Sequence, residues 1–257
     1  MKNKTILITG STSGIGLGIA RTFAAAGHTI IFNGLEKEGA DIAAGIAGQY
    51  KIEYAFFPTN MLDAKGLRDL VDQSAERFGG IDVLINNAGI QFVSPVEDFP
   101  EDKWNDIIAI NLTGPFHLIK AVWPYMKKNN GGRIVNIASA HGLFASENKS
   151  AYVASKHGII GLTKTVALEG APYHITCNAI CPGYVKTPLL QKQITDKAVL
   201  YKLSEEEIAE KYFLFKHAIK EFIPVQAIAD MAMLLASPGA NTITGAVLPI
   251  DAGWSAQ

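Results

Sequence analysis

The chain has 257 residues, of which 48% are hydrophobic and 18% charged, a composition typical of a globular protein with a sizeable core. Its formal net charge of -1 gives no electrostatic reason to expect a nucleic acid or an anionic membrane as a partner. The opening residues, MKNKTILITG, contain too short an apolar run for a secretory signal or a membrane span. We therefore expect a cytoplasmic protein.

Short apolar runs alternate with longer amphipathic segments along the chain. The runs are hydrophobic on both faces, which predicts buried strands at 5–9, 29–33, 52–57, 81–86, 133–138, 174–180 and 246–251. Helical patterns lie between them, for example at 15–27, 66–79, 101–128 and 151–170. This alternation is typical of βαβ units and predicts an α/β fold with a doubly wound parallel sheet. No linker or repeat divides it, which favours a single domain over 1–257.

One long segment departs from this alternation. Residues 187–224 show a strong helical pattern without a strand and are too many for a simple connection between a helix and a strand. Surface helices are one interpretation, and a lid over a substrate pocket is the other. The mixture of aromatic and charged residues in this segment favours the lid.

The two cysteines, Cys177 and Cys181, lie four residues apart in an apolar stretch. A metal site would need further ligands nearby, and none is obvious in the sequence. We expect two reduced, buried thiols and no metal site.

A glycine-rich turn, TGSTSGIG at residues 9–16, follows the first strand and opens the first helix. Such a turn brings backbone N–H groups and a helix N-terminus close to a pyrophosphate, so its position in the first βα unit indicates a dinucleotide site. After the second strand, Lys37 lies between Glu36 and Glu38, where a 2′-phosphate would meet more repulsion than attraction. The sequence therefore favours NAD, although Asn33 stands where an acidic residue would decide the question.

Three further motifs follow in order: NNAG at 86–89, then Ser139 thirteen residues before YVASK at 152–156, and CPGYVKT at 181–187. With the glycine turn, they resemble the short-chain dehydrogenase/reductase family over essentially the whole chain. The resemblance implies a Rossmann-like fold and hydride transfer with a nicotinamide cofactor. It places the cofactor contacts at Tyr152 and Lys156 and at Gly10, Thr12, Ser13, Gly14, Ile15, Gly16, Leu35, Asn60, Asn87, Ala88, Gly89, Pro182, Gly183, Val185 and Thr187. Asn60 departs from the family pattern, which usually has an aspartate against the adenine.

The resemblance also assigns a catalytic tetrad of Asn111, Ser139, Tyr152 and Lys156. Tyr152 and Lys156 are four residues apart on a predicted helix and share a face. A phenol with a pKa of about 10 needs its anion stabilised to work near neutral pH, and an ammonium about 4 Å away supplies roughly 4 kcal/mol. We therefore expect Lys156 to lower the pKa of Tyr152. Ser139 would hydrogen-bond the substrate oxygen, and Asn111 would anchor a water of the proton relay.

Residues beside the tetrad indicate the substrate. None of the four arginines lies in a pocket-forming stretch, so a substrate carboxylate would rely on Lys149 and His141 with amide donors. The set resembles the bacterial-type D-3-hydroxybutyrate dehydrogenases, in which such residues hold a small carboxylate. This resemblance implies oxidation of (R)-3-hydroxybutyrate to acetoacetate with NAD in a homotetramer. The substrate residues would be Ser139 and Tyr152 together with Gln91, His141, Lys149, Gln193 and Trp254.

Two alternatives remain open. A related reductase could act on a sugar, a steroid or an acyl-carrier thioester, but a thioester favours a basic rim and an NADP site, and a steroid favours a pocket without Lys149. A regulator that binds a nucleotide without catalysis is the other alternative, because a fold does not imply a function. The presence of both Tyr152 and Lys156 argues against it.

Overall fold

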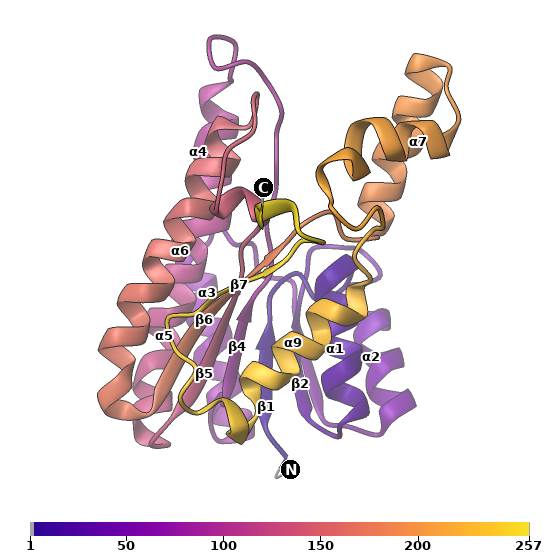
Figure 1. The fold of residues 1–257 in the computed structure, drawn as a ribbon. Helices are drawn as coiled ribbons and strands as arrows, with labels where there is room; N and C mark the ends of the chain where they lie inside the picture. The colour runs from indigo at the N-terminus through magenta and orange to yellow at the C-terminus, as the bar shows by residue number, and fades with distance from the viewer. Residues whose placement is uncertain (1–2, 257) are drawn as a thin grey trace.

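The computed structural model describes residues 3–256, which form a seven-stranded sheet in the order β3-β2-β1-β4-β5-β6-β7 (Figure 1). All neighbouring strands pair in parallel. The order reverses at β1, which lies between β2 and β4, and ligands of such sheets bind at this switch point beyond the carboxyl ends of the strands. The predicted doubly wound sheet is confirmed, with strands at Thr5–Ile8 (β1), Thr29–Asn33 (β2), Tyr54–Phe57 (β3), Val83–Asn86 (β4), Gly132–Ile137 (β5), Ile175–Pro182 (β6) and Val247–Ile250 (β7).

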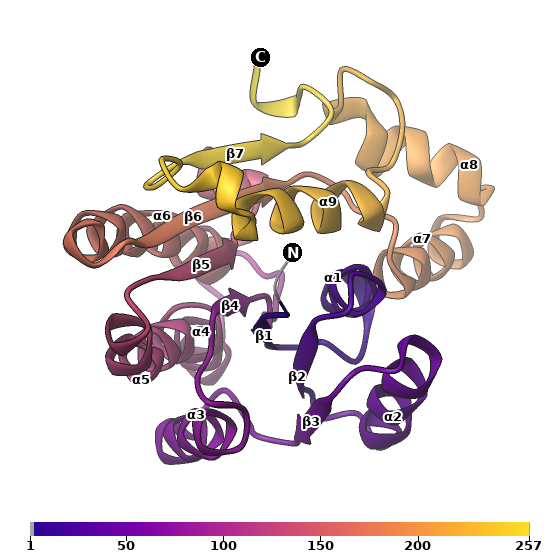
Figure 2. The ribbon, with the colours of Figure 1, turned by 90° about the horizontal axis from the view of Figure 1, so that it is seen from below.

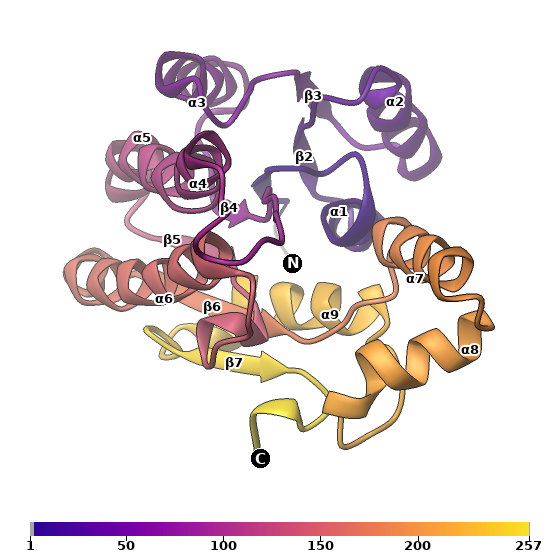
Figure 3. The ribbon, with the colours of Figure 1, turned by 90° about the horizontal axis from the view of Figure 1, so that it is seen from above.

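Helices cover both faces of the sheet (Figures 2 and 3). One face carries α1 (Gly14–Ala25), α2 (Gly39–Tyr50) and α9 (Val225–Ala236). The other carries α3 (Ala64–Phe78), α4 (Glu101–Ile108), α5 (Gly114–Lys128) and α6 (Ser150–Gly170). Strand side chains alternate between the two faces, so Ile6 and Ile8 belong to the core under α1 and α9, and Leu7 to the core under α3 and α5.

The helical segment predicted at 101–128 is continuous but not regular. A π-helical turn, Ala109–Thr113, separates α4 from α5. Turns of this kind are frequent at functional sites, and Asn111 lies inside this one. Single 3₁₀ turns complete the described helices, at Ala140–Gly142, Ala171–Tyr173, Leu214–Lys216, Pro238–Ala240 and Trp254–Ala256.

The segment 187–224, which we call the lid, stands beyond the carboxyl ends of the strands (Figure 1). It contains α7 (Pro188–Tyr201), α8 (Glu205–Ile208) and a second π-helical turn, Ala209–Phe213. Its own apolar cluster is separate from the cores under the sheet and is formed by Leu190, Ile194, Ile208 and Phe213. The prediction of helices is confirmed, with one β-bridge, between Val185 and Ile223, where the lid rejoins the sheet.

Two further predictions concern single features. Both cysteines are free thiols and buried, as expected. In the part of the chain that the structure describes, no helix has both the length and the apolar character needed to cross a membrane.

Candidate active site

The glycine-rich turn has a backbone that requires glycine. Gly10 and Gly14 have φ angles of +59° and +52°, in the left-handed region that favours glycine. A Cβ at Gly16 would lie 2.2 Å from the carbonyl oxygen of Gly10, so no side chain fits where the first helix passes the turn. These residues leave a cradle at the N-terminus of α1 that suits the pyrophosphate of a dinucleotide.

The NNAG motif holds the glycine turn from the side of β4. The hydroxyl of Thr9 accepts hydrogen bonds from the N–H groups of Asn87 and Ala88, at 2.9 and 3.0 Å. The Asn87 amide donates to the carbonyl oxygens of Thr9 and Gly10, at 2.9 and 3.1 Å. The predicted cofactor motifs at the ends of β1 and β4 therefore form one connected unit.

The CPGYVKT motif reaches the same unit from β6. A Cβ at Gly14 would lie 3.7 Å from the Thr187 methyl group, so the end of this motif adjoins the glycine turn. Thr187 caps α7 by accepting a hydrogen bond from the N–H of Leu190 at 3.2 Å. The predicted cofactor residues Pro182, Gly183 and Val185 thus join the sheet to the lid.

Glu36 supplies the acidic group that the end of β2 lacks. Its carboxylate accepts a hydrogen bond from the Thr12 hydroxyl and another, at 2.8 Å, from the Ser13 hydroxyl. Burial raises its pKa, but the hydrogen bonds from Thr12, the local backbone and Ser13 outweigh this effect and leave the pKa below its ordinary value. An ionised acid therefore lies on the glycine turn, where the sequence suggested only a repulsive neighbourhood.

Two asparagines near this acid have structural contacts. The amide of Asn33 donates to the carbonyl oxygens of Phe57 and Thr59, at 3.0 and 2.8 Å. Asn60 accepts a hydrogen bond from the N–H of Leu62 at 3.0 Å within its own turn. Leu35, predicted to contact the cofactor, is 61% exposed, so its side chain is available to a ligand.

Ser139, Tyr152 and Lys156 come together at the ends of β5 and α6. The Ser139 hydroxyl accepts a hydrogen bond from the N–H of His141 at 3.1 Å and lies close enough to Tyr152 to lower its pKa. The ammonium of Lys156 donates to the carbonyl oxygen of Ile137 at 2.9 Å and lies 5.6 Å from the centre of the Tyr152 ring. The shared helix face inferred from the four-residue spacing is confirmed.

The expected effect of Lys156 on Tyr152 is wrong for the free protein. Burial raises the pKa of Tyr152, and the hydrogen bond from Ser139 offsets only part of this increase. Burial also lowers the pKa of Lys156 to about 8. The ammonium donates to the Ile137 carbonyl, and Lys156 is not among the groups that shift the pKa of Tyr152 in the free protein.

Asn111 has a positioning contact that the sequence did not indicate. Its amide accepts from the N–H of Ile90 at 2.9 Å and donates to the Ile90 carbonyl at 3.0 Å and to the Ser155 hydroxyl at 3.1 Å. The π-helical turn therefore holds the residue after NNAG in place and links it to α6. The predicted role of Asn111 in anchoring a water stays a prediction.

His141 and Trp254 lie buried against the tetrad. Their rings meet edge to face with centroids 5.3 Å apart, and His141 is 6.0 Å from the Tyr152 ring. The Nε2 atom of His141 lies 2.9 Å from the Ser146 hydroxyl. Burial, then the charges of Lys149, Lys216 and His157, lower the pKa of His141 to about 3. His141 is therefore a neutral hydrogen-bonding group rather than a cation.

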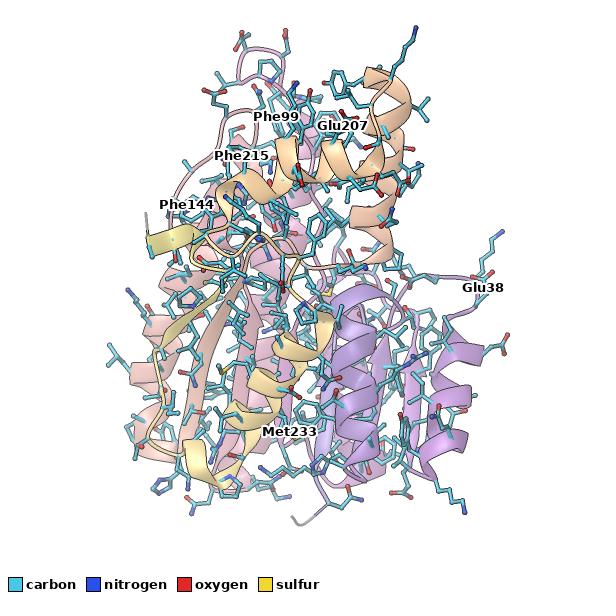
Figure 4. The ribbon with its side chains drawn as sticks, turned by 45° about the vertical axis from the view of Figure 1, so that its right-hand side comes forward. Glu38, Phe99, Phe144, Glu207, Phe215 and Met233 are labelled. Atoms are coloured by element: carbon cyan, nitrogen blue, oxygen red, sulfur yellow. The ribbon has the colours of Figure 1, made fainter. Side chains whose placement is uncertain are left out.

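Aromatic rings surround Trp254 on its other sides. Tyr184 stacks on it with ring centroids 5.1 Å apart and an interplanar angle of 19°. Phe144 lies 4.8 Å from it and is labelled beside the C-terminal segment in Figure 4. Trp254 thus packs within its own chain. The sequence did not indicate a role for Tyr184, although this residue lies inside the CPGYVKT motif.

Lys149 is a half-buried cation beside this aromatic cluster. Burial, followed by the charges of Lys216 and Lys197, lowers its pKa to about 8. The ion pairs found among residues 3–256 all lie on the exposed surface, and none includes Lys149. A nearby anion would stabilise a partly desolvated cation that has other cations around it, so the predicted role of Lys149 in holding a substrate carboxylate stays a prediction.

The two amide donors predicted to hold the substrate, Gln91 and Gln193, are less buried than His141 and Trp254. Gln91 is exposed, and Gln193 is half-buried on α7. Among the described residues, neither amide hydrogen-bonds to His141 or Lys149. Their roles in holding a substrate therefore stay predictions.

Comparisons with known proteins agree with this geometry. Residues 4–198 match the family model described as short chain dehydrogenase. The chain is 50% identical over 256 residues to D-beta-hydroxybutyrate dehydrogenase of Rhizobium meliloti (strain 1021), covering 99% of each protein. It is 45% identical over 258 residues to the Cupriavidus necator protein of the same name, covering 100% of each. A crystal structure of an actinorhodin polyketide ketoreductase variant with NADPH matches with a TM-score of 0.92 at 32% identity, over 99% of this chain and 98% of that one. The chain therefore belongs to the short-chain dehydrogenase family.

Proposed function

We propose that this dehydrogenase oxidises (R)-3-hydroxybutyrate to acetoacetate with NAD. The observation that carries the proposal is the cation Lys149, whose pKa is lowered to about 8, in the loop between Ser139 and Tyr152. A site for an anion therefore adjoins a site for an alcohol, and 3-hydroxybutyrate carries both groups. The two relatives named D-beta-hydroxybutyrate dehydrogenase, at 50% and 45% identity, support this substrate.

The carboxylate end of the substrate sets the charge that the pocket must provide. Transferring an unpaired carboxylate out of water has a free-energy cost of several kcal/mol. Lys149 offsets this cost with its charge, and the neutral His141 contributes a hydrogen bond. Trp254, Tyr184 and Phe144 form an apolar wall at this end, which suits a short carbon chain.

The alcohol end of the substrate lies at the tetrad. Ser139 donates a hydrogen bond to the hydroxyl oxygen, and Tyr152 accepts the hydroxyl proton as a phenolate. NAD, when bound, supplies the hydride acceptor and a positive ring charge close to Tyr152. That charge adds to Lys156 and opposes the burial that raises the pKa of Tyr152 in the free protein.

Glu36 supports NAD over NADP. Its ionised carboxylate lies on the hydroxyls of Thr12 and Ser13, beside the cradle for the pyrophosphate. A ribose 2′-hydroxyl can donate to such a carboxylate, whereas a 2′-phosphate is repelled by it. The similar ketoreductase was crystallised with NADPH, so the fold alone does not select the cofactor.

The test is turnover by the purified chain, followed by the absorbance of NADH or NADPH. We expect oxidation of (R)-3-hydroxybutyrate with NAD, little with NADP, and little of the (S) enantiomer. Faster reaction with a sugar, a steroid or an acyl thioester would favour a different reductase of the family. Binding of NAD without turnover of any alcohol would favour the regulator.

We also propose a homotetramer and a cytoplasmic location. The tetramer rests on the resemblance to the family, whose long helices at 105–127 and 152–169 commonly pair between subunits.

A further inference from the structure

We propose that Lys216, which the lid carries, is a specificity-determining residue that binds the substrate carboxylate together with Lys149. The inference rests on the proposed function and adds a second cation, which comes from the lid rather than from the loop before α6. Its consequence is that the site favours an anionic substrate over a neutral one of similar size.

The ammonium of Lys216 lies beside two of the residues predicted to bind the substrate, Trp254 and His141. It is 5.2 Å from the centre of the Trp254 ring and donates to the Ser146 hydroxyl at 3.3 Å. The same hydroxyl lies 2.9 Å from the Nε2 atom of His141. One hydroxyl therefore joins the lid lysine to the buried histidine, so Lys216 faces the group predicted to hold the substrate.

The backbone around Lys216 is fixed to the segment that carries Trp254. The N–H groups of Ala218 and Ile219 both donate to the Ala252 carbonyl, at 2.8 and 3.0 Å. The Asp251 carboxylate accepts from the N–H groups of Gly253 and Ser255, at 3.1 and 2.8 Å, and so shapes the turn that presents Trp254. These hydrogen bonds thus fix the position of Lys216 relative to Trp254.

His217, the neighbour of Lys216, holds this end of the lid to the sheet. It is buried, its Nε2 atom accepts from the N–H of Tyr184 at 3.2 Å, and its Nδ1 atom donates to the Glu221 carbonyl at 2.8 Å. Figure 4 labels Phe215, on the other side of Lys216, on the lid above the C-terminal segment. Since the residues after Lys216 are hydrogen-bonded to the sheet and to the C-terminal turn, its position is set by the fold.

The electrostatics of the pocket favour an anion between the two lysines. Burial is the largest cause of the lowered pKa of Lys149, and the charge of Lys216 is the second largest. The charge of Lys216 also contributes to the low pKa of His141. Two ammonium groups that repel each other both gain when a carboxylate lies between them. A carboxylate has two oxygens and can accept from both sides, whereas a neutral alcohol gains nothing from the second cation.

The test compares anionic and neutral ligands in Lys216→Met, which keeps an unbranched side chain against Trp254 and removes the charge. We expect kcat/KM for (R)-3-hydroxybutyrate to fall about tenfold or more, as for the loss of one charge-assisted contact. We expect little change for 2-butanol, a neutral secondary alcohol. Binding of butyrate, measured by calorimetry in the presence of NAD, should weaken by a similar factor, since butyrate has the carboxylate but no hydroxyl to react.

Control variants keep the test specific to this residue. Lys211→Met removes an exposed lid cation that lies near the Tyr212 ring and should leave both ligands unaffected. Lys216→Arg should retain most of the butyrate affinity. If Lys216→Met unfolds, Lys216→Gln provides the same comparison.

The outcomes separate this inference from the proposed function. Equal losses for 3-hydroxybutyrate and 2-butanol, or unchanged butyrate binding, would overturn the role of Lys216 while the wild-type protein still oxidised 3-hydroxybutyrate. Failure of the wild-type protein to oxidise 3-hydroxybutyrate would instead contradict the proposed function. In that case, a selective loss of butyrate affinity in Lys216→Met would still support a carboxylate site shared by the lid.

Discussion

Burial raises the pKa of Tyr152 in the free protein, and its predicted role as the base determines what we expect of its variants. Burial also lowers the pKa of Lys156 to about 8, and added positive charge beside Tyr152 would favour its phenolate. Tyr152→Phe should leave NAD affinity nearly unchanged and reduce kcat by about a hundredfold or more, the range of general acid–base catalysis. Lys156→Ala should reduce both. Stopped-flow turnover and NAD titration check this, and near wild-type turnover by Tyr152→Phe would refute the mechanism.

Lys149 predicts the pH dependence of anion binding. Its pKa is lowered to about 8 in the free protein, and a bound carboxylate favours the charged form. Between about pH 6 and pH 8, where butyrate is ionised, its affinity should therefore be constant, and above pH about 8 it should fall up to tenfold per pH unit as the free protein loses the proton. The charges of Lys197 and Lys216 act on the same group, whereas His141, with a pKa of about 3, stays neutral throughout.

Calorimetry of butyrate binding across this pH range provides the measurement. Lys149→Met should bind weakly at every pH, and the decline centred near the Lys149 pKa should disappear. Lys164→Met, which alters an exposed lysine on the same helix that carries Tyr152, should keep it. A decline that persists in Lys149→Met would assign the titration to another group.

The charge of Glu36 leads us to expect a preference for NAD over NADP. Replacing its charge in Glu36→Gln removes the repulsion of a 2′-phosphate and weakens the acceptor for a 2′-hydroxyl. The ratio of kcat/KM for NAD to that for NADP should fall about tenfold or more, a change of about 1.4 kcal/mol or more. Glu38→Gln is the matched control, because Glu38 is also exposed near the end of β2 but lies outside the hydrogen bonds to Thr12 and Ser13. An unchanged ratio in Glu36→Gln would remove the structural support for NAD.

At the scale of elements, we predict that α7 and α8 of the lid move together. Their apolar cluster is separate from those under the sheet, and two backbone hydrogen bonds join the two ends of the lid. The N–H of Lys186 donates to the Ile223 carbonyl and that of Ile223 to the Tyr184 carbonyl, each at 2.9 Å. We predict that α7 and α8 exchange amide hydrogens faster in the free protein than with NAD and butyrate bound, because closure excludes water from hydride transfer.

Hydrogen-exchange mass spectrometry of the lid checks this prediction. The strand β4, buried in the sheet, is the internal control and should exchange equally in both states. Equal exchange of the lid with and without ligands would show that the lid is a static surface element.

Local motifs explain which features of the site were predictable from sequence. The glycine turn, Ser139 and the Tyr152–Lys156 pair depend on short spacings within one element, and the structure places them as expected. Glu36, Tyr184 and Lys216 act through contacts with distant segments, such as Ser146 with Lys216, seventy residues apart. The pKa of Tyr152 was misjudged for a related reason: spacing gives a shared helix face but not the carbonyl of Ile137 that holds Lys156.

For the fold of the whole molecule too, local patterns were predictable and contacts between distant segments were not. Alternating apolar runs were sufficient to predict the parallel sheet, because strands buried on both faces leave a strong pattern. The π-helical turn at Ala109–Thr113 was not predictable, since it depends on Asn111 reaching Ile90 and Ser155 rather than on local propensity.

The oligomeric state of the protein is a further prediction for the whole molecule. Large apolar side chains remain exposed on the outer helices of one sheet face, with exposed fractions of 44% for Phe116 on α5 and 79% for Leu168 on α6. These are the helices that pair between subunits in the resembled family, so we expect a mass near four times the 27.6 kDa of the chain.

Multi-angle light scattering at micromolar concentration measures this mass. Phe116→Glu combined with Leu168→Glu should dissociate the tetramer, because each charge would be buried without a partner in the interface. Val199→Glu, at a lid residue that is 77% exposed, is the matched control and should leave the mass unchanged. A wild-type monomer would refute the tetramer, and an intact tetramer in the double variant would place its interfaces on other surfaces of the chain.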